Sequence, residues 1–124
     1  ESCVELLKRG KAVLVCPEQL GGMTTPRVPS EILKNDGKIS VISKEGKDVS
    51  KEFKKGAKEA LKIAKLVDAK VAILKNGSPS CGSKNIYDGT FSGNKIKGEG
   101  ITAKLFVENG IEVFSEDEAH KFLL

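Results

Sequence analysis

Short, mostly apolar runs alternate with helical patterns along the 124 residues of this chain. Residues 12–15, 71–74 and 111–114 have the length and composition of buried strands. Apolar residues recur at helical spacing most clearly over residues 50–67. Further helical patterns cover residues 2–9 and 101–109. Strands separated by helices predict a mainly parallel sheet with helices on both faces, so we expect one doubly wound, Rossmann-like α/β domain over residues 1–124.

The segments between these elements differ in character. Residues 17–38 are expected to form a long polar loop, and residues 38–43 alternate as an edge strand or hairpin would. The glycine-rich stretch 76–100 exceeds the ~12–15 residues of an ordinary loop, which favours a site-forming role. Near the C-terminus, the pattern Ser115-x-x-Glu118 predicts the start of a capped helix.

Composition argues against two classes of partner. The 21 Lys and Arg residues interleave with 17 Asp and Glu residues, so the net charge of +4 is spread over the surface. One tyrosine and no tryptophan offer little for stacking on bases, and nucleic-acid binding is therefore disfavoured. No apolar run approaches the ~20 residues of a membrane span, so a membrane partner is not expected either.

Three cysteines are an odd number, and no secretory signal precedes them. This usage favours a reducing cytoplasm over a disulfide framework. Cys16 follows the run 12–15, and Cys81 follows the run 71–74 within the segment Ser78–Gly82. Parallel strands bring the segments at their carboxyl ends to one edge of the sheet. The two thiols are therefore expected to meet there in a thiolate-bound inorganic site.

Five ordered motifs within about residues 8–116 resemble one bacterial protein family. They are Cys16–Gly22, Thr25–Arg27, Ser78–Gly82, Tyr87–Gly93 and Asn109–Glu116. Several motifs in order are more specific than any single tetrapeptide. On these motifs the chain is similar to the thiouracil desulfurase (TudS-like) family, formerly a bacterial family of unknown function.

The resemblance implies a cytoplasmic enzyme that removes sulfur from thiolated pyrimidines by non-redox hydrolysis, with a [4Fe-4S] cluster held by three cysteines. Cys16 and Cys81 match two of these ligands. The family's third cysteine follows a first strand, a context that Cys3 lacks, so Cys3 is expected to be a structural or surface thiol. The third ligand and its strand are expected upstream of Glu1. The chain as given is not expected to hold the cluster by itself.

The resemblance also assigns chemistry to two further residues. Three protein ligands leave one iron open, and that iron is a soft Lewis acid toward a thiocarbonyl sulfur. Glu18 matches the base that takes a proton from the attacking water, and Ser78 matches a hydroxyl that donates to the substrate or relays a proton. No net electron transfer is required.

Each of these residues also has a plainer interpretation. Glu18 is alternatively a solvated carboxylate, and Ser78 alternatively only shapes a turn. Arg27 either anchors an anion or a substrate carbonyl, or pairs with Glu31 four residues later.

The remaining candidates lie in the second half of the chain. Tyr87 and Asp88 either bind the edge of a pyrimidine or belong to an ordinary Asp-Gly turn. His120 is expected to be exposed on the terminal helix. The alternative to an enzyme is a non-catalytic small-ligand or anion-binding module that uses residues 76–100. A thiol redox protein is disfavoured because the chain has no Cys-x-x-Cys. The particular thiolated base and the oligomeric state stay open.

Overall fold

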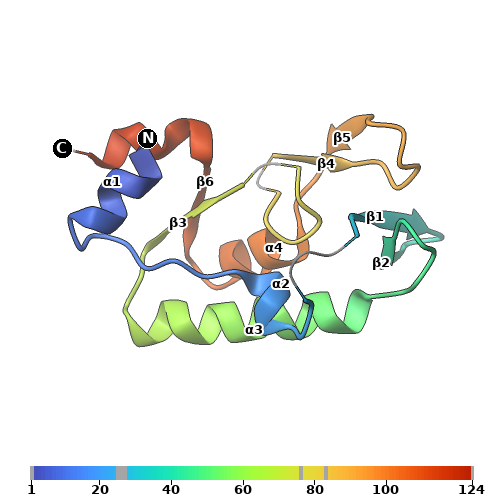
Figure 1. The fold of residues 1–124 in the computed structure, drawn as a ribbon, viewed down its shortest axis with the longest axis horizontal. Helices are drawn as coiled ribbons and strands as arrows, with labels where there is room; N and C mark the ends of the chain where they lie inside the picture. The colour runs from blue at the N-terminus through green and yellow to red at the C-terminus, as the bar shows by residue number, and fades with distance from the viewer. Residues whose placement is uncertain (1, 25–27, 76, 83, 124) are drawn as a thin grey trace.

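The computed structural model describes residues 2–24, 28–75, 77–82 and 84–123, and Figure 1 shows their arrangement. The elements in chain order are α1 (Ser2–Lys8), α2 (Pro17–Leu20), β1 (Ser30–Asn35), β2 (Lys38–Ser43), α3 (Ser50–Leu66), β3 (Val71–Leu74), β4 (Asn85–Tyr87), β5 (Lys95–Lys97), α4 (Ile101–Glu108), β6 (Glu112–Ser115) and the 3₁₀ helix η1 (Glu116–Phe122). Helices α1 and η1 pack together at one end of the molecule. Within these ranges, no helix has the length and apolar character needed to cross a membrane.

The strands form three separate pairs. β3 and β6 are parallel, with Val71 opposite Glu112 and Leu74 opposite Ser115. β1 pairs with β2, and β4 pairs with β5, both in antiparallel hairpins. The expected α/β class is confirmed in this mixed form. The described residues do not form the expected continuous parallel sheet, because each of these sheets has only two strands.

The strand expected over residues 12–15 is not present. This segment carries neither helix nor strand, and Val13 and Leu14 are 61% and 82% exposed. A strand exists only where a neighbouring backbone accepts and donates hydrogen bonds, and the described residues place no such edge beside it. This segment has the apolar composition of a buried strand, but the described residues do not supply the neighbouring strand that it would pair with.

Helix α3 matches its predicted range closely and forms the base of the molecule in Figure 1. Its buried face is built largely from small residues with one aromatic ring, Phe53, and its lysines face solvent. At its start, the Asp48 carboxylate accepts the Ser50 N–H at 2.9 Å, and hydrogen bonds from the side chain and the backbone of Ser50 lower the pKa of Asp48. The Ser50 hydroxyl also accepts the Val41 N–H of β2 at 2.8 Å, which ties the hairpin to the helix.

Two predicted loops contain regular structure. Residues 17–38 hold α2 and β1, and the β1–β2 hairpin turns at Asp36 and Gly37, which both adopt positive φ (49° and 78°) as a type I′ turn requires. Residues 76–100 hold the β4–β5 hairpin. At the C-terminus, the predicted capping box of Ser115 and Glu118 is confirmed, although it opens a 3₁₀ helix.

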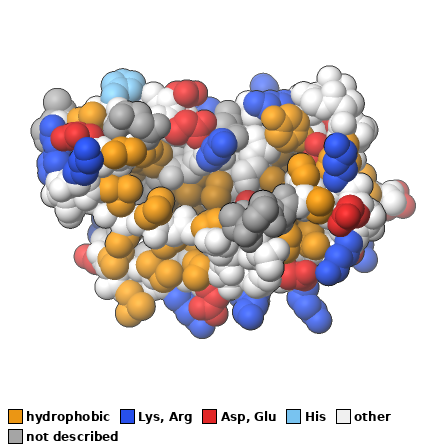
Figure 2. All heavy atoms as spheres, viewed as in Figure 1, with side chains coloured by type: hydrophobic (Ala, Val, Ile, Leu, Met, Phe, Trp, Pro, Cys, Tyr) orange, Lys and Arg blue, Asp and Glu red, His pale blue; other side chains and the backbone are white. Residues whose placement is uncertain are grey.

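Two apolar clusters lie along α3. One surrounds Phe53 and joins the β1–β2 hairpin to Ile86 of β4. The other surrounds Ala60 and Ala64 and joins α3 to Phe106 of α4. On the surface, acidic side chains lie among the lysines, as the interleaved sequence predicts (Figure 2). The packed helices and strands thus hold fixed the two segments that carry Cys16 and Cys81.

Candidate functional site

Cys16 stands at the N-terminal boundary of the short helix α2. It is half-buried, its carbonyl accepts the Leu20 N–H at 3.1 Å, and Pro17 occupies the first helical position. Helix α2 presses its backbone directly onto α3 through two glycines. A Cβ on Gly21 would overlap the Glu52 carbonyl, and a Cβ on Gly56 would overlap the Pro17 carbonyl. The position of Cys16 therefore depends on this close contact between two backbones.

Cys81 lies in a loop that is held by hydrogen bonds. The Ser78 hydroxyl oxygen accepts the N–H groups of Ser80 at 3.0 Å and Cys81 at 3.1 Å. Ser80, only 1% exposed, shares a hydrogen bond of 2.7 Å with the fully buried hydroxyl of Thr102 on α4. These bonds fix the turn of the loop at the position of the thiol.

The first turn of α4 also holds the loop of Cys81 in place. Backbone N–H groups of Ile101 and Thr102 donate to the carbonyls of Pro79 and Ser80, both at 2.8 Å. Gly100 packs so closely that a Cβ there would collide with the peptide bond joining Ser80 to Cys81. A helix N-terminus is a common anion site, but here these donors are already engaged by loop carbonyls. This geometry gives no support to the anion-binding alternative.

The structure brings the two predicted catalytic residues together. The Ser78 hydroxyl donates to Glu18 Oε1 in a long hydrogen bond of 3.5 Å, although the residues are far apart in the sequence. Ser78 therefore contacts both the Glu18 carboxylate and the backbone of the loop that carries Cys81. Because Glu18 lies in the first turn of α2, this bond joins the two cysteine segments.

The electrostatics of Cys81 show what surrounds its sulfur. The pKa of the Cys81 thiol is raised to about 11. Burial is the largest cause, the nearby Glu18 and Cys16 also raise the pKa, and the hydrogen bond to Ser80 opposes the rise. Cys16, Glu18 and Cys81 thus share one partly buried environment. Thiolates and a carboxylate in such a place are mutually repulsive unless a cation lies among them. This donor set fits a thiophilic metal centre.

The described residues supply only part of such a centre. Among them, no group of three or more His, Cys, Asp or Glu side chains is arranged to hold a metal ion. Cys3 does not join Cys16 and Cys81, and lies instead on α1 against an apolar groove. None of the three cysteines forms a disulfide.

The remaining sequence candidates have identifiable surroundings. Arg27 lies outside the described residues. Glu31, 8% exposed, accepts the N–H groups of Gly89 at 2.9 Å and Phe91 at 3.1 Å. The Asp88 carboxylate accepts hydrogen bonds from the N–H and the hydroxyl of Thr90, as expected of a residue in a turn.

Tyr87 lies next to the site loop. Lys95 Nζ sits 5.3 Å from the centre of its ring, and a Cβ on Gly77 would be 3.5 Å from Tyr87 Cε2. His120 is exposed, as expected.

Sequence reasoning missed two residues that support the loop of Cys81, Gly100 and Thr102. Each acts through contacts with a segment distant in sequence, and neither belongs to a recognisable local motif. A glycine directly before a helix and a threonine in its first turn were the only available signals.

Known proteins are similar to this chain in sequence and in fold. The chain is 43% identical over 129 residues to the uncharacterized protein YbbK of Bacillus subtilis (strain 168), a match that covers 99% of this chain and 85% of YbbK. The structure of this chain is similar to that of the [4Fe-4S]-dependent thiouracil desulfidase TudS, with a TM-score of 0.86. The two sequences are 42% identical, and the match covers 96% of this chain and 76% of that protein. The family model described as 2-thiouracil desulfurase matches residues 1–118. With two thiols, a carboxylate and a hydroxyl gathered at one site, the chain belongs to the 2-thiouracil desulfurase family.

Proposed function

We propose that the complete protein removes sulfur from thiouracil-type thiocarbonyl compounds by hydrolysis without net electron transfer. The observation that carries this proposal is the convergence of Cys16, Cys81, Glu18 and Ser78 on one environment. The desulfidase TudS, which is similar over 96% of this chain, supports the substrate class. A cytoplasmic location is part of the proposal, since an odd number of cysteines fits a reducing compartment better than a disulfide framework.

Cys16 and Cys81 are the residues of this chain that would hold a [4Fe-4S] cluster. The third ligand is proposed to be a cysteine upstream of Glu1, since no third protein ligand joins this pair among the described residues. When bound through three thiolates, such a cluster supplies an open, soft coordination position that polarises a thiocarbonyl. Burial raises the pKa of the Cys81 thiol, and a bound metal would oppose that rise by stabilising the thiolate.

Glu18 is proposed to be the general base. Its carboxylate takes a proton from the water that attacks the ring carbon bearing sulfur, so that the C–O bond forms as the C–S bond breaks. Sulfur leaves as hydrosulfide, and the pyrimidine keeps the oxygen. Ser78 holds the carboxylate by its hydrogen bond and can pass a proton to the substrate ring.

Anaerobic reconstitution of the full-length protein with iron and sulfide tests the proposal. Cys16→Ser and Cys81→Ser are each expected to lose iron, while Cys3→Ser is expected to keep it. Iron and sulfide analysis of the three variants measures this difference. Equal iron content in all three would contradict the ligand assignment.

Turnover of 2-thiouracil, followed by hydrosulfide release and uracil formation, tests the reaction. Glu18→Gln is expected to reduce turnover by about 10²–10⁴-fold with little change in iron content, because only the base is lost. Glu45→Gln, in the exposed turn after β2, is the matched control and should leave turnover unchanged. A reconstituted, iron-loaded protein that releases no hydrosulfide would overturn the proposed function.

A further inference from the structure

Two buried hydroxyls lie behind the Cys81 sulfur. Ser80, next to Cys81 in the chain, is 1% exposed, and Thr102 in the first turn of α4 is fully buried. Their oxygens are 2.7 Å apart, a distance typical of a good O–H···O hydrogen bond. The Ser80 oxygen also lies 3.8 Å from the Cys81 sulfur. The sulfur and the two oxygens are thus linked in series from the site into the interior, and we call Ser80 and Thr102 the hydroxyl pair.

The backbone holds the hydroxyl pair in register with the sulfur. The Ser80 N–H donates to the Ser78 hydroxyl at 3.0 Å. The Ser80 carbonyl accepts the N–H groups of Thr102 at 2.8 Å and Ala103 at 3.2 Å. Both backbone polar groups of Ser80 are therefore engaged, and its hydroxyl is held between the sulfur of Cys81 and Thr102.

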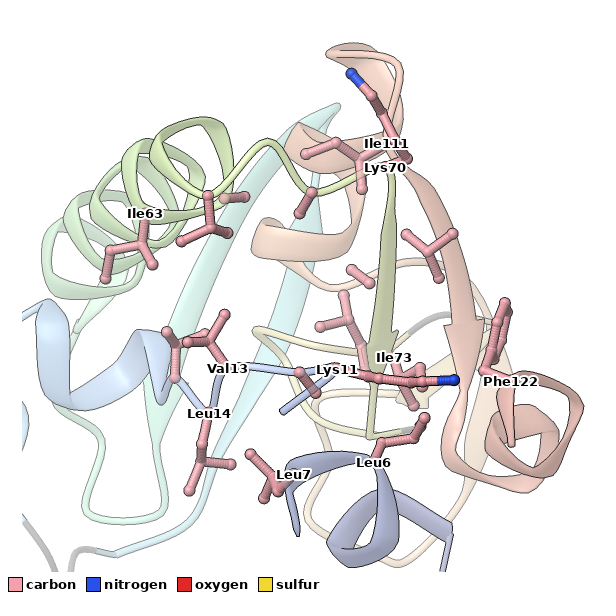
Figure 3. A pocket seen from close by; sticks show the side chains of 18 of the residues that line it. Leu6, Leu7, Lys11, Val13, Leu14, Ile63, Lys70, Ile73, Ile111 and Phe122 are labelled. Carbon is pink, nitrogen blue, oxygen red and sulfur yellow. The ribbon is translucent and has the colours of Figure 1, made fainter. Parts of the chain in front are cut away.

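The elements next to the hydroxyl pair bring apolar side chains to this part of the molecule. Strand β3, which leads into the loop of Cys81, and helix α4 both line an apolar groove of about 760 Å³. Ile73 of β3 lines this groove in Figure 3, and Phe106 of α4 lines it as well. Buried polar groups in such a setting require hydrogen-bond partners. The hydroxyl pair supplies them for each of its members and for the sulfur.

The hydrogen atoms of the pair can serve the sulfur in either of its states. A free thiol can donate its S–H to Ser80 while Ser80 donates to Thr102. A sulfur that binds a metal has lost this hydrogen and only accepts. Both hydroxyls can then rotate, so that Thr102 donates to Ser80 and Ser80 donates to the sulfur. The same contacts stay hydrogen-bonded in both arrangements, so no buried hydroxyl loses its partner.

We propose that Ser80, oriented by Thr102, is the hydrogen-bond donor to the metal-bound sulfur of Cys81. The proposal rests on the proposed function in one respect, which is that a [4Fe-4S] cluster binds this sulfur. Ser80 and Thr102 are positioning residues, because they act through the sulfur and not on the substrate. A hydrogen bond draws negative charge from a ligating sulfur, and such bonds help to set the reduction potential of a cluster and its hold on the protein. A neutral hydroxyl does this without adding a charge beside Glu18.

The experiment uses the full-length protein, reconstituted anaerobically with iron and sulfide. The cluster's reduction potential is measured by a titration followed by electron paramagnetic resonance, and its retention by the rate of iron loss to a chelator. Ser80→Ala is expected to shift the potential to a more negative value and to speed iron loss by about 10-fold or more. Thr102→Val keeps the Ser80 donor, so its potential should shift less. Thr102→Ser keeps both hydroxyls and should restore the unmodified potential.

The double variant Ser80→Ala, Thr102→Val separates this role from a merely structural one. Each single substitution leaves a buried hydroxyl without its partner, whereas the double variant leaves none and should be more stable than the sum of the two losses predicts. Its reduction potential should nevertheless equal that of Ser80→Ala, because both proteins lack the donor. A potential that follows stability across the set would overturn the proposal.

Ser43→Ala is the matched control. Ser43 of β2 is 3% exposed, and its hydroxyl accepts the Lys47 N–H at 3.1 Å, so it is a buried, hydrogen-bonded hydroxyl in the β1–β2 hairpin. Its loss should lower stability and leave the potential unchanged. An equal shift in Ser43→Ala and Ser80→Ala would show that the shift is not specific to the sulfur, and this would overturn the proposal.

The outcomes distinguish this proposal from the proposed function. An iron-loaded Ser80→Ala protein with an unchanged potential overturns the donor role and leaves the desulfurase proposal standing. A loaded protein whose potential shifts as expected, but which releases no hydrosulfide from 2-thiouracil, supports the donor role while the desulfurase proposal fails. A full-length protein that takes up no iron at Cys81 overturns both.

Discussion

The two cysteine-bearing segments are held in place in different ways. The loop around Cys81 is fixed by hydrogen bonds from Ser78 and from the first turn of α4. Cys16 lies at the start of α2, and the position of this helix depends on its close backbone contact with α3. The comparison teaches that one half of the site is stabilised by polar contacts and the other by close backbone packing. Substitutions should therefore affect the two halves separately.

Gly56→Ala is expected to have the largest effect. In an ordinary helix this change would stabilise by about 1 kcal/mol, but here the added methyl would overlap the Pro17 carbonyl. We expect a net loss of about 1–3 kcal/mol in the free energy of unfolding, with α2 displaced. Urea denaturation measures the loss, and Lys58→Ala on the exposed face of α3 is the control. A more stable Gly56→Ala protein would show that the backbones do not touch.

Thr102→Val tests the polar half. It removes the partner of the buried Ser80 hydroxyl, and we expect a loss of about 1–3 kcal/mol. The double variant Ser80→Ala, Thr102→Val should recover part of this loss, because no hydroxyl is then left unpaired. Strictly additive losses in urea denaturation would mean that the two hydroxyls do not stabilise each other.

The Cys81 thiol gives a pH-dependent test on the metal-free protein. Its pKa is about 11 in the folded protein against 9.0 for an ordinary thiol, so at pH 8 its alkylation should be about 100-fold slower than in urea. Mass spectrometry of iodoacetamide-treated protein measures the rate. The folded state holds the proton more tightly, so stability is full below pH 9 and falls as the pH rises toward 11. A Cys81 that reacts as fast folded as unfolded would show that it is not buried.

Glu118, on η1, is expected to give the smallest effect. The Ser115 N–H, Lys84 and Lys121 lower its pKa to about 2. Since the folded-state pKa is depressed from 4.5, the stabilisation is present above pH 4.5 and is lost as the pH falls toward 2. Glu118→Gln should reduce the loss of unfolding free energy between pH 4.5 and 2, as measured by urea denaturation, without changing the alkylation rate of Cys81. An identical acid limb in both proteins would exclude this contribution.

The sequence predicted those elements whose signal is local. Helix α3 and strand β3 follow from periodicity and apolar runs. The resemblance places Glu18 and Ser78 in one site, and the two side chains are hydrogen-bonded. Strand β1 lies in a segment where Pro26 and Pro29 favour a loop, although Asp36-Gly37 is a hairpin signal.

Other features depend on distant partners and could not be predicted from sequence alone. Residues 12–15 have the composition of a strand but lack a paired edge here. Glu31 accepts backbone N–H groups of residues 89 and 91, and Gly100 packs against the loop of Cys81, so each contacts backbone groups far away in the chain. Such contacts have no sequence pattern, since any acceptor or any small residue at the right place would provide them.

The amides of α4 that donate to Pro79 and Ser80 have a consequence for dynamics. Because the loop and the first helical turn share these bonds, neither can open without the other, and they form one cooperative unfolding unit. Fraying of α4 would therefore also expose the thiol of Cys81.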